Sequence, residues 1–94
     1  MKIGDLQWDD QNIGHIAGHN VNPEEVEDIC FGVHIASKEE GRRYILSGQS
    51  AGGRYLNVVV ERVAKGLFRP ITAFEMREGY KRRYRARLRS RRKP

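Results

Sequence analysis

Arginine and tyrosine are the residue types in this sequence best suited to chemistry on a phosphate group. They recur in the second half of the chain as Arg42, Arg43, Tyr44, Arg54, Tyr55, Arg69, Tyr80, Arg83 and Tyr84. A guanidinium pairs with phosphate, and its charge could stabilise the pentacoordinate phosphorane formed when RNA is cleaved. Such cleavage needs no metal ion, because the ribose 2′-hydroxyl is itself the nucleophile and a base, an acid and a cationic clamp suffice. The alternative is that the tyrosines are core or interface aromatics and the arginines are solvated.

Positive charge is concentrated in the same half of the chain. Residues 1–41 hold two lysines and nine acids, a net charge of −7, whereas residues 42–94 hold sixteen basic residues and three acids, a net charge of +13. Ten of the last eighteen residues are basic. Clustered positive charge attracts a polyanion and steers its approach. RNA, DNA and an acidic protein all remain possible partners on this ground.

Other kinds of chemistry have weaker signals. His15 and His19 have the i, i+4 spacing by which two imidazoles grip zinc, but the glutamate of an HExxH motif is absent, so we expect no metal site and no cofactor. Cys30 is the single cysteine. It cannot form an internal disulfide and suits a reducing compartment, so we interpret it as a small core residue. No secretory signal pattern and no apolar run long enough to span a membrane is visible, and we expect a cytoplasmic protein.

Helix-start signals mark two segments near the N-terminus. Asp9 or Asp10 can cap a helix by accepting backbone N–H bonds, and apolar residues then recur at spacings of three and four, which predicts a first helix over residues 9–18. Asn22-Pro23-Glu24-Glu25 matches an N-cap, a first helical position and an acidic first turn. Gly32 is a suitable stop for this second helix.

The hydrophobic period changes to two after residue 32, which predicts strands. Polar turns separate four candidates, at residues 33–36, 43–48, 54–61 and 67–74. Their short connections favour an antiparallel meander. Pro70 cannot donate to a ladder, so the last strand should lie at an edge or be bulged there.

The chain ends in a predicted basic amphipathic helix, in which Met76, Tyr80, Tyr84 and Leu88 recur every four residues. The expected fold is α+β, with two N-terminal helices, a four-stranded antiparallel meander and the C-terminal helix. These elements form one domain over residues 1–89, followed by a flexible basic tail at residues 90–94.

An ordered set of motifs spans residues 8–85. It comprises Trp8-Asp9-x-x-Asn12-x-x-His15-Ile16-x-x-His19, Pro23-Glu24-Glu25-Val26-Glu27, Arg43-Tyr44, Gly53-Arg54-Tyr55-Leu56, Arg69-Pro70-Ile71-Thr72-Ala73 and Tyr80-Lys81-Arg82-Arg83-Tyr84. Any one piece is weak, but the ordered set resembles the BrnT family of bacterial toxins. The resemblance implies a RelE-like endoribonuclease of a type II toxin–antitoxin system, which needs no metal ion. It also implies a cognate antitoxin with a ribbon-helix-helix domain, through which the pair would contact DNA only indirectly.

The resemblance also implies site residues. The candidates for catalysis are Arg43, Arg54, Arg69, His19 and Tyr84, with the arginines as a phosphate clamp and His19 or Glu40 as a proton shuttle. The candidates for RNA binding on the terminal helix are Arg82, Arg83, Arg85 and Arg87.

One departure from the family pattern keeps a second function open. Many family members have an arginine directly after the Thr-Ala pair, where this chain has Phe74. The alternative is therefore a non-catalytic RNA- or protein-binding module that retains the toxin fold. A protein whose terminal helix enters the DNA major groove has less support, because no turn-linked helix pair precedes that helix.

Overall fold

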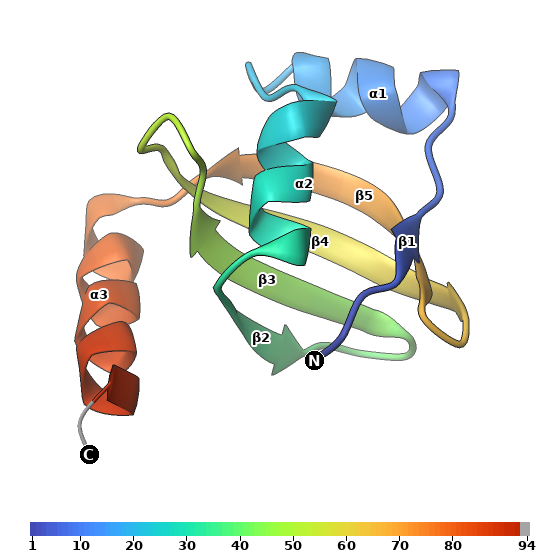
Figure 1. Ribbon diagram of the computed structural model, residues 1–94. Coiled ribbons are helices and arrows are strands. Elements are labelled where there is room, and N and C mark those ends of the chain that lie inside the picture. Colours follow the sequence, from blue (N-terminus) through green and yellow to red (C-terminus); the bar gives the residue numbers. More distant parts are fainter. Residues whose placement is uncertain (93–94) are drawn as a thin grey trace.

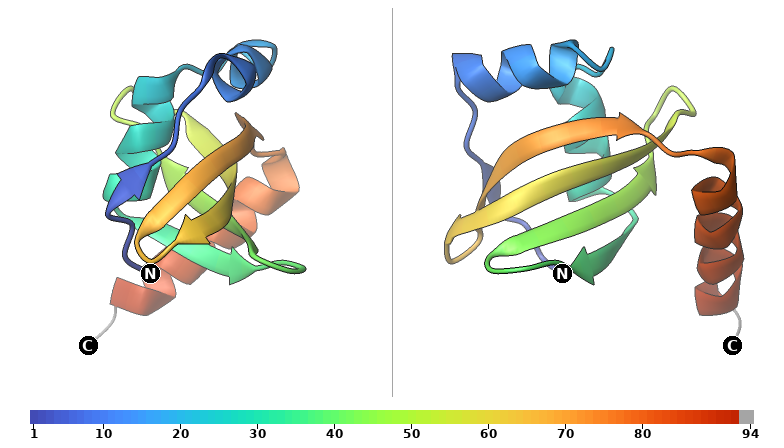
Figure 2. Two further views of the ribbon diagram at one scale, coloured as in Figure 1. Left: turned by 90° about the vertical axis from the view of Figure 1, so that its right-hand side faces the viewer. Right: turned by 180° about the vertical axis from the view of Figure 1, so that it is seen from behind.

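A single β-sheet with three helices makes up the part of the chain that the computed structural model describes, residues 1–92 without the side chain of Arg92 (Figure 1). The elements in chain order are β1 (Asp5–Leu6), α1 (Asp10–Ala17), α2 (Pro23–Phe31), β2 (His34–Lys38), β3 (Arg43–Gln49), β4 (Tyr55–Ala64), β5 (Leu67–Glu75) and α3 (Glu78–Arg92). The expected α+β class is confirmed. Figure 2 shows α1 and α2 together on one side of the sheet and α3 beyond its end.

The sheet has five strands in the order β1-β5-β4-β3-β2, and it is mixed. Strands β2 to β5 form the expected antiparallel meander. The expectation of four strands was wrong, because β1 adds to the outer side of β5 in parallel register, with Leu6 opposite Phe68. Two residues are too few to produce a period-two signal, and this strand exists only through backbone bonds such as Gln7 N–H to the carbonyl of Phe68 at 2.8 Å.

Both predicted helix starts are confirmed, each with a reciprocal capping box. The Asp9 carboxylate accepts from the Asn12 backbone N–H while the Asn12 side chain accepts from that of Asp9, both at 2.9 Å. Asn22 and Glu25 make the same exchange at 2.9 and 3.1 Å, with Pro23 at the first helical position. Each box satisfies backbone donors that would otherwise lack a partner.

Glycines close the turns and allow one close approach. Gly41, Gly53 and Gly66 have positive φ in the three hairpin turns, a conformation that is strained for other residues. At Gly32, which ends α2, a Cβ atom would lie 2.4 Å from the carbonyl oxygen of Asp28. The predicted irregularity at Pro70 is a bulge, because the register shifts between Val59, which opposes Thr72, and Val60, which opposes Pro70.

The main core lies between the sheet and the pair α1 and α2. Its fully buried members are Ile16, Val26, Ile29, Leu46, Leu56, Val58, Val60 and Ala73. Asn12 is also buried in this layer, where its amide donates to the carbonyls of Gln7 and Pro70 at 3.0 Å. This side chain therefore ties α1 both to the segment that precedes the helix and to β5.

A smaller cluster fastens α3 to the opposite face of the sheet. Ile35, Met76 and Tyr84 are its buried members, and Tyr55, Tyr80 and Leu88 pack against it. Met76 precedes the helix, so the predicted apolar stripe is real but begins before α3 does. The helix continues through Arg92, so residues 90–92 of the expected tail belong to it, and residues 93–94 lie outside the described part. Within residues 1–92, no helix has the length and apolar character needed to cross a bilayer.

Candidate nucleic-acid interface

Three polar side chains meet where Tyr80 of α3 contacts the sheet. Ser47 on β3 and Asn57 on β4 are direct cross-strand partners, and both are buried. The Ser47 hydroxyl donates to Asn57 Oδ1 at 2.7 Å, and the Tyr80 hydroxyl on α3 lies 3.1 Å from Ser47 Oγ. Because Ser47 has one proton and gives it to Asn57, Tyr80 is the donor in the second contact. The hydroxyl of Tyr80 is thereby fixed over the sheet.

Two clefts open on either side of this tyrosine. The smaller, of about 240 Å³, is lined by Ile35, Ser47, Tyr80, Arg83, Tyr84 and Arg87. The larger, of about 500 Å³, is lined by Ile45, Asn57, Phe74, Arg77, Gly79, Tyr80 and Arg83. Tyr80 and Arg83 line both clefts, and the Arg83 guanidinium carbon lies 5.5 Å from the centre of the Tyr80 ring. The polar side chains of Ser47 and Asn57, the ring of Tyr80 and the guanidinium of Arg83 thus lie together around the two clefts.

The charge around these clefts is positive. Arg77, Arg83 and Arg87 are exposed and form no ion pair with a carboxylate of residues 1–92. No aspartate or glutamate of the described residues lines either cleft. Three unneutralised guanidiniums beside hydroxyl and amide groups can hold the oxygens of a phosphate.

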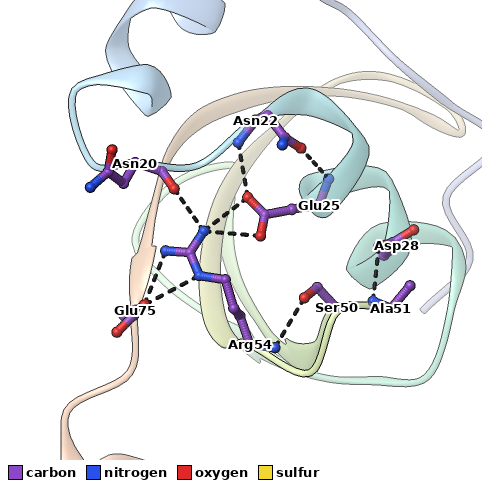
Figure 3. Close-up of polar contacts among 8 residues, drawn as sticks. All are labelled: Asn20, Asn22, Glu25, Asp28, Ser50, Ala51, Arg54 and Glu75. Carbon is purple, nitrogen blue, oxygen red and sulfur yellow. Dashed lines mark hydrogen bonds and ion pairs between the residues drawn. The ribbon is translucent and has the colours of Figure 1, made fainter.

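Arg54, a predicted catalytic residue, is occupied by internal partners (Figure 3). Its Nη1 donates to both carboxylate oxygens of Glu25 at 2.9 Å and to the carbonyl of Asn20 at 2.7 Å. Its Nε and Nη2 donate to Glu75 at 3.2 and 3.1 Å. These bonds, chiefly the one to Glu25, raise the pKa of Arg54 above its ordinary value. Arg54 therefore joins the α1–α2 turn, α2 and the end of β5.

Arg69 is similarly engaged at the other end of β5. Its Nη2 lies 2.8 Å from the Asp9 carboxylate and 3.5 Å from the side-chain oxygen of Gln11. The backbone N–H of Asn12, and then Arg69, lower the pKa of Asp9 below its ordinary value of 3.8. Arg69 thus supports the cap of α1.

The three predicted arginines do not converge on one point. Arg43 and Arg69 flank Glu61 in the sheet register, and Arg43 forms an exposed ion pair with Glu61 at 3.6 Å. Arg54 lies seven positions before Glu61 along β4, which corresponds to about 23 Å of strand. Spacing along the chain did not reveal that Arg54 lies at the start of β4, whereas Arg43 and Arg69 lie beside Glu61 farther along that strand.

The remaining predicted residues divide between packing and exposure. Tyr84 is 4% exposed and lies edge-on to Tyr55, with ring centroids 6.1 Å apart. His19 is exposed in the turn after α1; its ring lies 6.5 Å from that of Phe74, which lines the larger cleft, but His19 itself is not among the lining residues. The predicted RNA-binding arginines of α3, which are Arg82, Arg83, Arg85 and Arg87, are all exposed. Of these four, Arg83 and Arg87 line the clefts.

Sequence reasoning missed Ser47, Asn57 and Arg77 as site residues. Ser47 and Asn57 occupy alternating positions in apolar strands, where a lone polar residue gives no signal until its cross-strand partner is known. Cys30 is buried as expected, and this burial raises the pKa of its thiol to about 12.

Comparison with known proteins gives no assignment for this arrangement. The chain matches no protein-family model, no curated protein and no solved structure. Its function must therefore be argued from the site itself and from the motifs of its sequence.

Proposed function

We propose that this chain is an RNA-directed protein of the BrnT toxin type: a RelE-like endoribonuclease that cleaves RNA without a metal ion. In this proposal it acts in the cytoplasm, and a cognate antitoxin with a ribbon-helix-helix domain neutralises it. The observation that carries the proposal is the position of Arg83, which lines both clefts around Tyr80 above the buried Ser47–Asn57 pair. The ordered motifs of the sequence supply the family.

The clefts would hold a single RNA strand by its phosphates. Arg77, Arg83 and Arg87 supply the clamp, because they are exposed and free of carboxylate partners among the described residues. Arg54 and Arg69 do not fill this role, since their guanidiniums already bind Glu25, Glu75 and Asp9. The proposed clamp therefore lies on α3 and on Arg77, the residue before it, rather than on the strands.

The reaction would form a 2′,3′-cyclic phosphate. The 2′-oxygen attacks phosphorus while a base accepts its proton; the bond to the 5′-oxygen then breaks, and an acid protonates that leaving oxygen. His19 is the better placed of the two proton carriers suggested by the sequence, because it borders Phe74 at the larger cleft, whereas Glu40 lies in the β2–β3 turn. Tyr80, with its hydroxyl held over the sheet, is the proposed acid.

A second candidate function is RNA binding without cleavage. Phe74 stands at the margin of the larger cleft, at the position where the resembling family often has arginine. A phenyl ring offers a stacking surface to a base but no charge for a transition state. This module would use the same arginines and clefts.

The two candidates are separated by incubating the purified chain with single-stranded RNA in buffer that contains a chelator. A nuclease yields fragments that end in cyclic phosphate, whereas a binding module shifts the RNA on a gel and leaves it intact. Tyr80→Phe should lower the cleavage rate at least about tenfold while the RNA affinity is retained. Arg89→Ala, which removes an exposed charge of the same helix that lines neither cleft, is the control. Intact RNA together with undisturbed growth of cells that express the chain would exclude the toxin proposal.

A further inference from the structure

A second pair of clefts lies at the end of the sheet where β3 begins. These clefts are on the face of the sheet opposite Tyr80. One, of about 400 Å³, is lined by Gly41, Arg42, Tyr44, Arg62, Ala64 and Lys65. The other, of about 550 Å³, is lined by Met1, Lys2, Gly4, Tyr44, Arg62, Lys65, Gly66 and Phe68. Tyr44, Arg62 and Lys65 belong to both. Tyr44 and Ser47 are three positions apart on β3, so their side chains lie on opposite faces.

The charge of these clefts is unbalanced. Lys2, Arg42, Arg62 and Lys65 are exposed, and none forms an ion pair within residues 1–92. No carboxylate of the described chain lines either cleft. The acids of the adjacent turn, which are Glu39 and Glu40, are exposed outside the clefts, and Glu61 is paired with Arg43. Four cations therefore line the two clefts that share Tyr44, and no carboxylate of the described residues lines either cleft.

The ring at the centre is held in place. Tyr44 is half-buried and lies edge-on to Phe68, with ring centroids 6.1 Å apart. Lys38 Nζ lies 5.3 Å from the Tyr44 ring centroid and also donates to the carbonyls of Glu39 and Gly41, so it fixes the turn beside the ring. The backbone N–H of Arg62 on β4 donates to the carbonyl of Arg42 at 2.9 Å, which holds Arg42, the residue before β3, beside Arg62.

We infer that Tyr44 and its four cations, Lys2, Arg42, Arg62 and Lys65, form a second binding site for single-stranded RNA, separate from the α3 clefts. Cations that follow a phosphate backbone around an aromatic stacking surface are the recurring means of binding a single strand without sequence preference. The identity of the ligand rests on the RNA-directed function proposed above, but not on cleavage. The site would bind nucleotides outside the segment that is cleaved, so that the RNA contacts a longer stretch of the protein surface.

The probe for this site is a 2′-O-methyl tetra-uridylate, which cannot be cleaved because its 2′-oxygens are blocked. It is titrated into the isotope-labelled full chain, and backbone amide shifts are followed by NMR. We expect shifts at residues 41–44 and 62–66 that saturate independently of those at residues 77–83. Arg62→Ala/Lys65→Ala should weaken the first set about tenfold and leave the second unchanged.

The control double variant Arg82→Ala/Arg89→Ala removes the same charge from α3, and the shifts at residues 41–44 and 62–66 should persist in it. The site would be refuted by shifts confined to residues 77–83, by no shifts at all, or by an Arg62→Ala/Lys65→Ala variant that binds as before. Shifts at residues 41–44 and 62–66 without any at residues 77–83 would keep this site and refute the α3 clefts as the RNA-binding centre. The two proposals therefore fail separately.

Discussion

One nitrogen of Arg54, Nη1, donates to both carboxylate oxygens of Glu25 at 2.9 Å, and thereby joins the start of β4 to the first turn of α2. The same Glu25 accepts from the Asn22 backbone N–H in the capping box. Arg54, which the motif pattern suggested for phosphate binding, thus belongs to the structural framework, meaning the contacts that hold β4 to α2. Arg77, Arg83 and Arg87, by contrast, form no ion pair with a carboxylate of the described residues and line the clefts around Tyr80.

The first prediction concerns this framework. Arg54→Ala should lower the free energy of unfolding by about 1–3 kcal/mol, because it leaves the partly buried Glu25 without its cationic partner. Arg54→Lys should recover only part of this loss, since an ammonium cannot reproduce the fork to Glu25 and Glu75. Urea unfolding measures both, with exposed Arg89→Ala as the control. An Arg54→Ala variant as stable as the parent would return Arg54 to the list of ligand-binding candidates.

The second prediction concerns Asp9, whose pKa is lowered first by the Asn12 backbone N–H and then by Arg69. A carboxyl whose pKa is depressed in the folded state binds its proton more readily when unfolded. Its stabilisation is therefore complete above the unfolded value of 3.8 and is lost as the pH falls through the lower folded value. Asp9→Asn retains a good N-cap but cannot titrate. The urea midpoint of the Asp9→Asn variant should fall less than that of the parent when the pH is lowered below about 4. Equal acid sensitivity of the two proteins would contradict the proposed contribution of Asp9 to stability.

The third prediction compares two glycines. At Gly32 an added Cβ would lie 2.4 Å from the Asp28 carbonyl oxygen, so Gly32→Ala should destabilise the fold by about 1–3 kcal/mol. At Gly14, which is an exposed position of α1, no atom lies within 4 Å of an added Cβ. Gly14→Ala should therefore stabilise by up to about 1 kcal/mol through helix propensity. Thermal unfolding of the two variants should shift in opposite directions, and a shared direction would show that the geometry at Gly32 has been misjudged.

The fourth prediction concerns Arg83 and the salt dependence of RNA binding. If Arg83 contacts one phosphate, Arg83→Ala should reduce the slope of log affinity against log salt by about 0.7, the value for one single-strand contact. Arg89→Ala, which lines neither α3 cleft, should change the slope less. The measurement is fluorescence anisotropy of a labelled, 2′-O-methylated oligonucleotide over a salt series. Identical slopes for the two variants would argue for a diffuse attraction rather than a built site.

Local signals predicted the elements well because their causes are local. Asp9, Asn22 and Pro23 mark the helix starts through bonds that span three residues, and Pro70 marks the bulge because it lacks an N–H. The two-residue strand β1 could not be predicted, since nothing but the distant edge of β5 defines it. The RelE-like relationship stays a prediction.

The candidate site was harder to predict for a physical reason. The sequence by itself determined the helix caps, the meander, the basic surplus of the second half and the helical stripe of Met76, Tyr80, Tyr84 and Leu88. Only the tertiary structure decided which arginines are neutralised, because Arg54 and Arg69 meet carboxylates that lie 29 and 60 positions away in the chain. It also brought Ser47, Asn57 and Tyr80 together across three elements. Charge is a property of residues, but whether that charge is available to a ligand depends on which side chains folding places beside it.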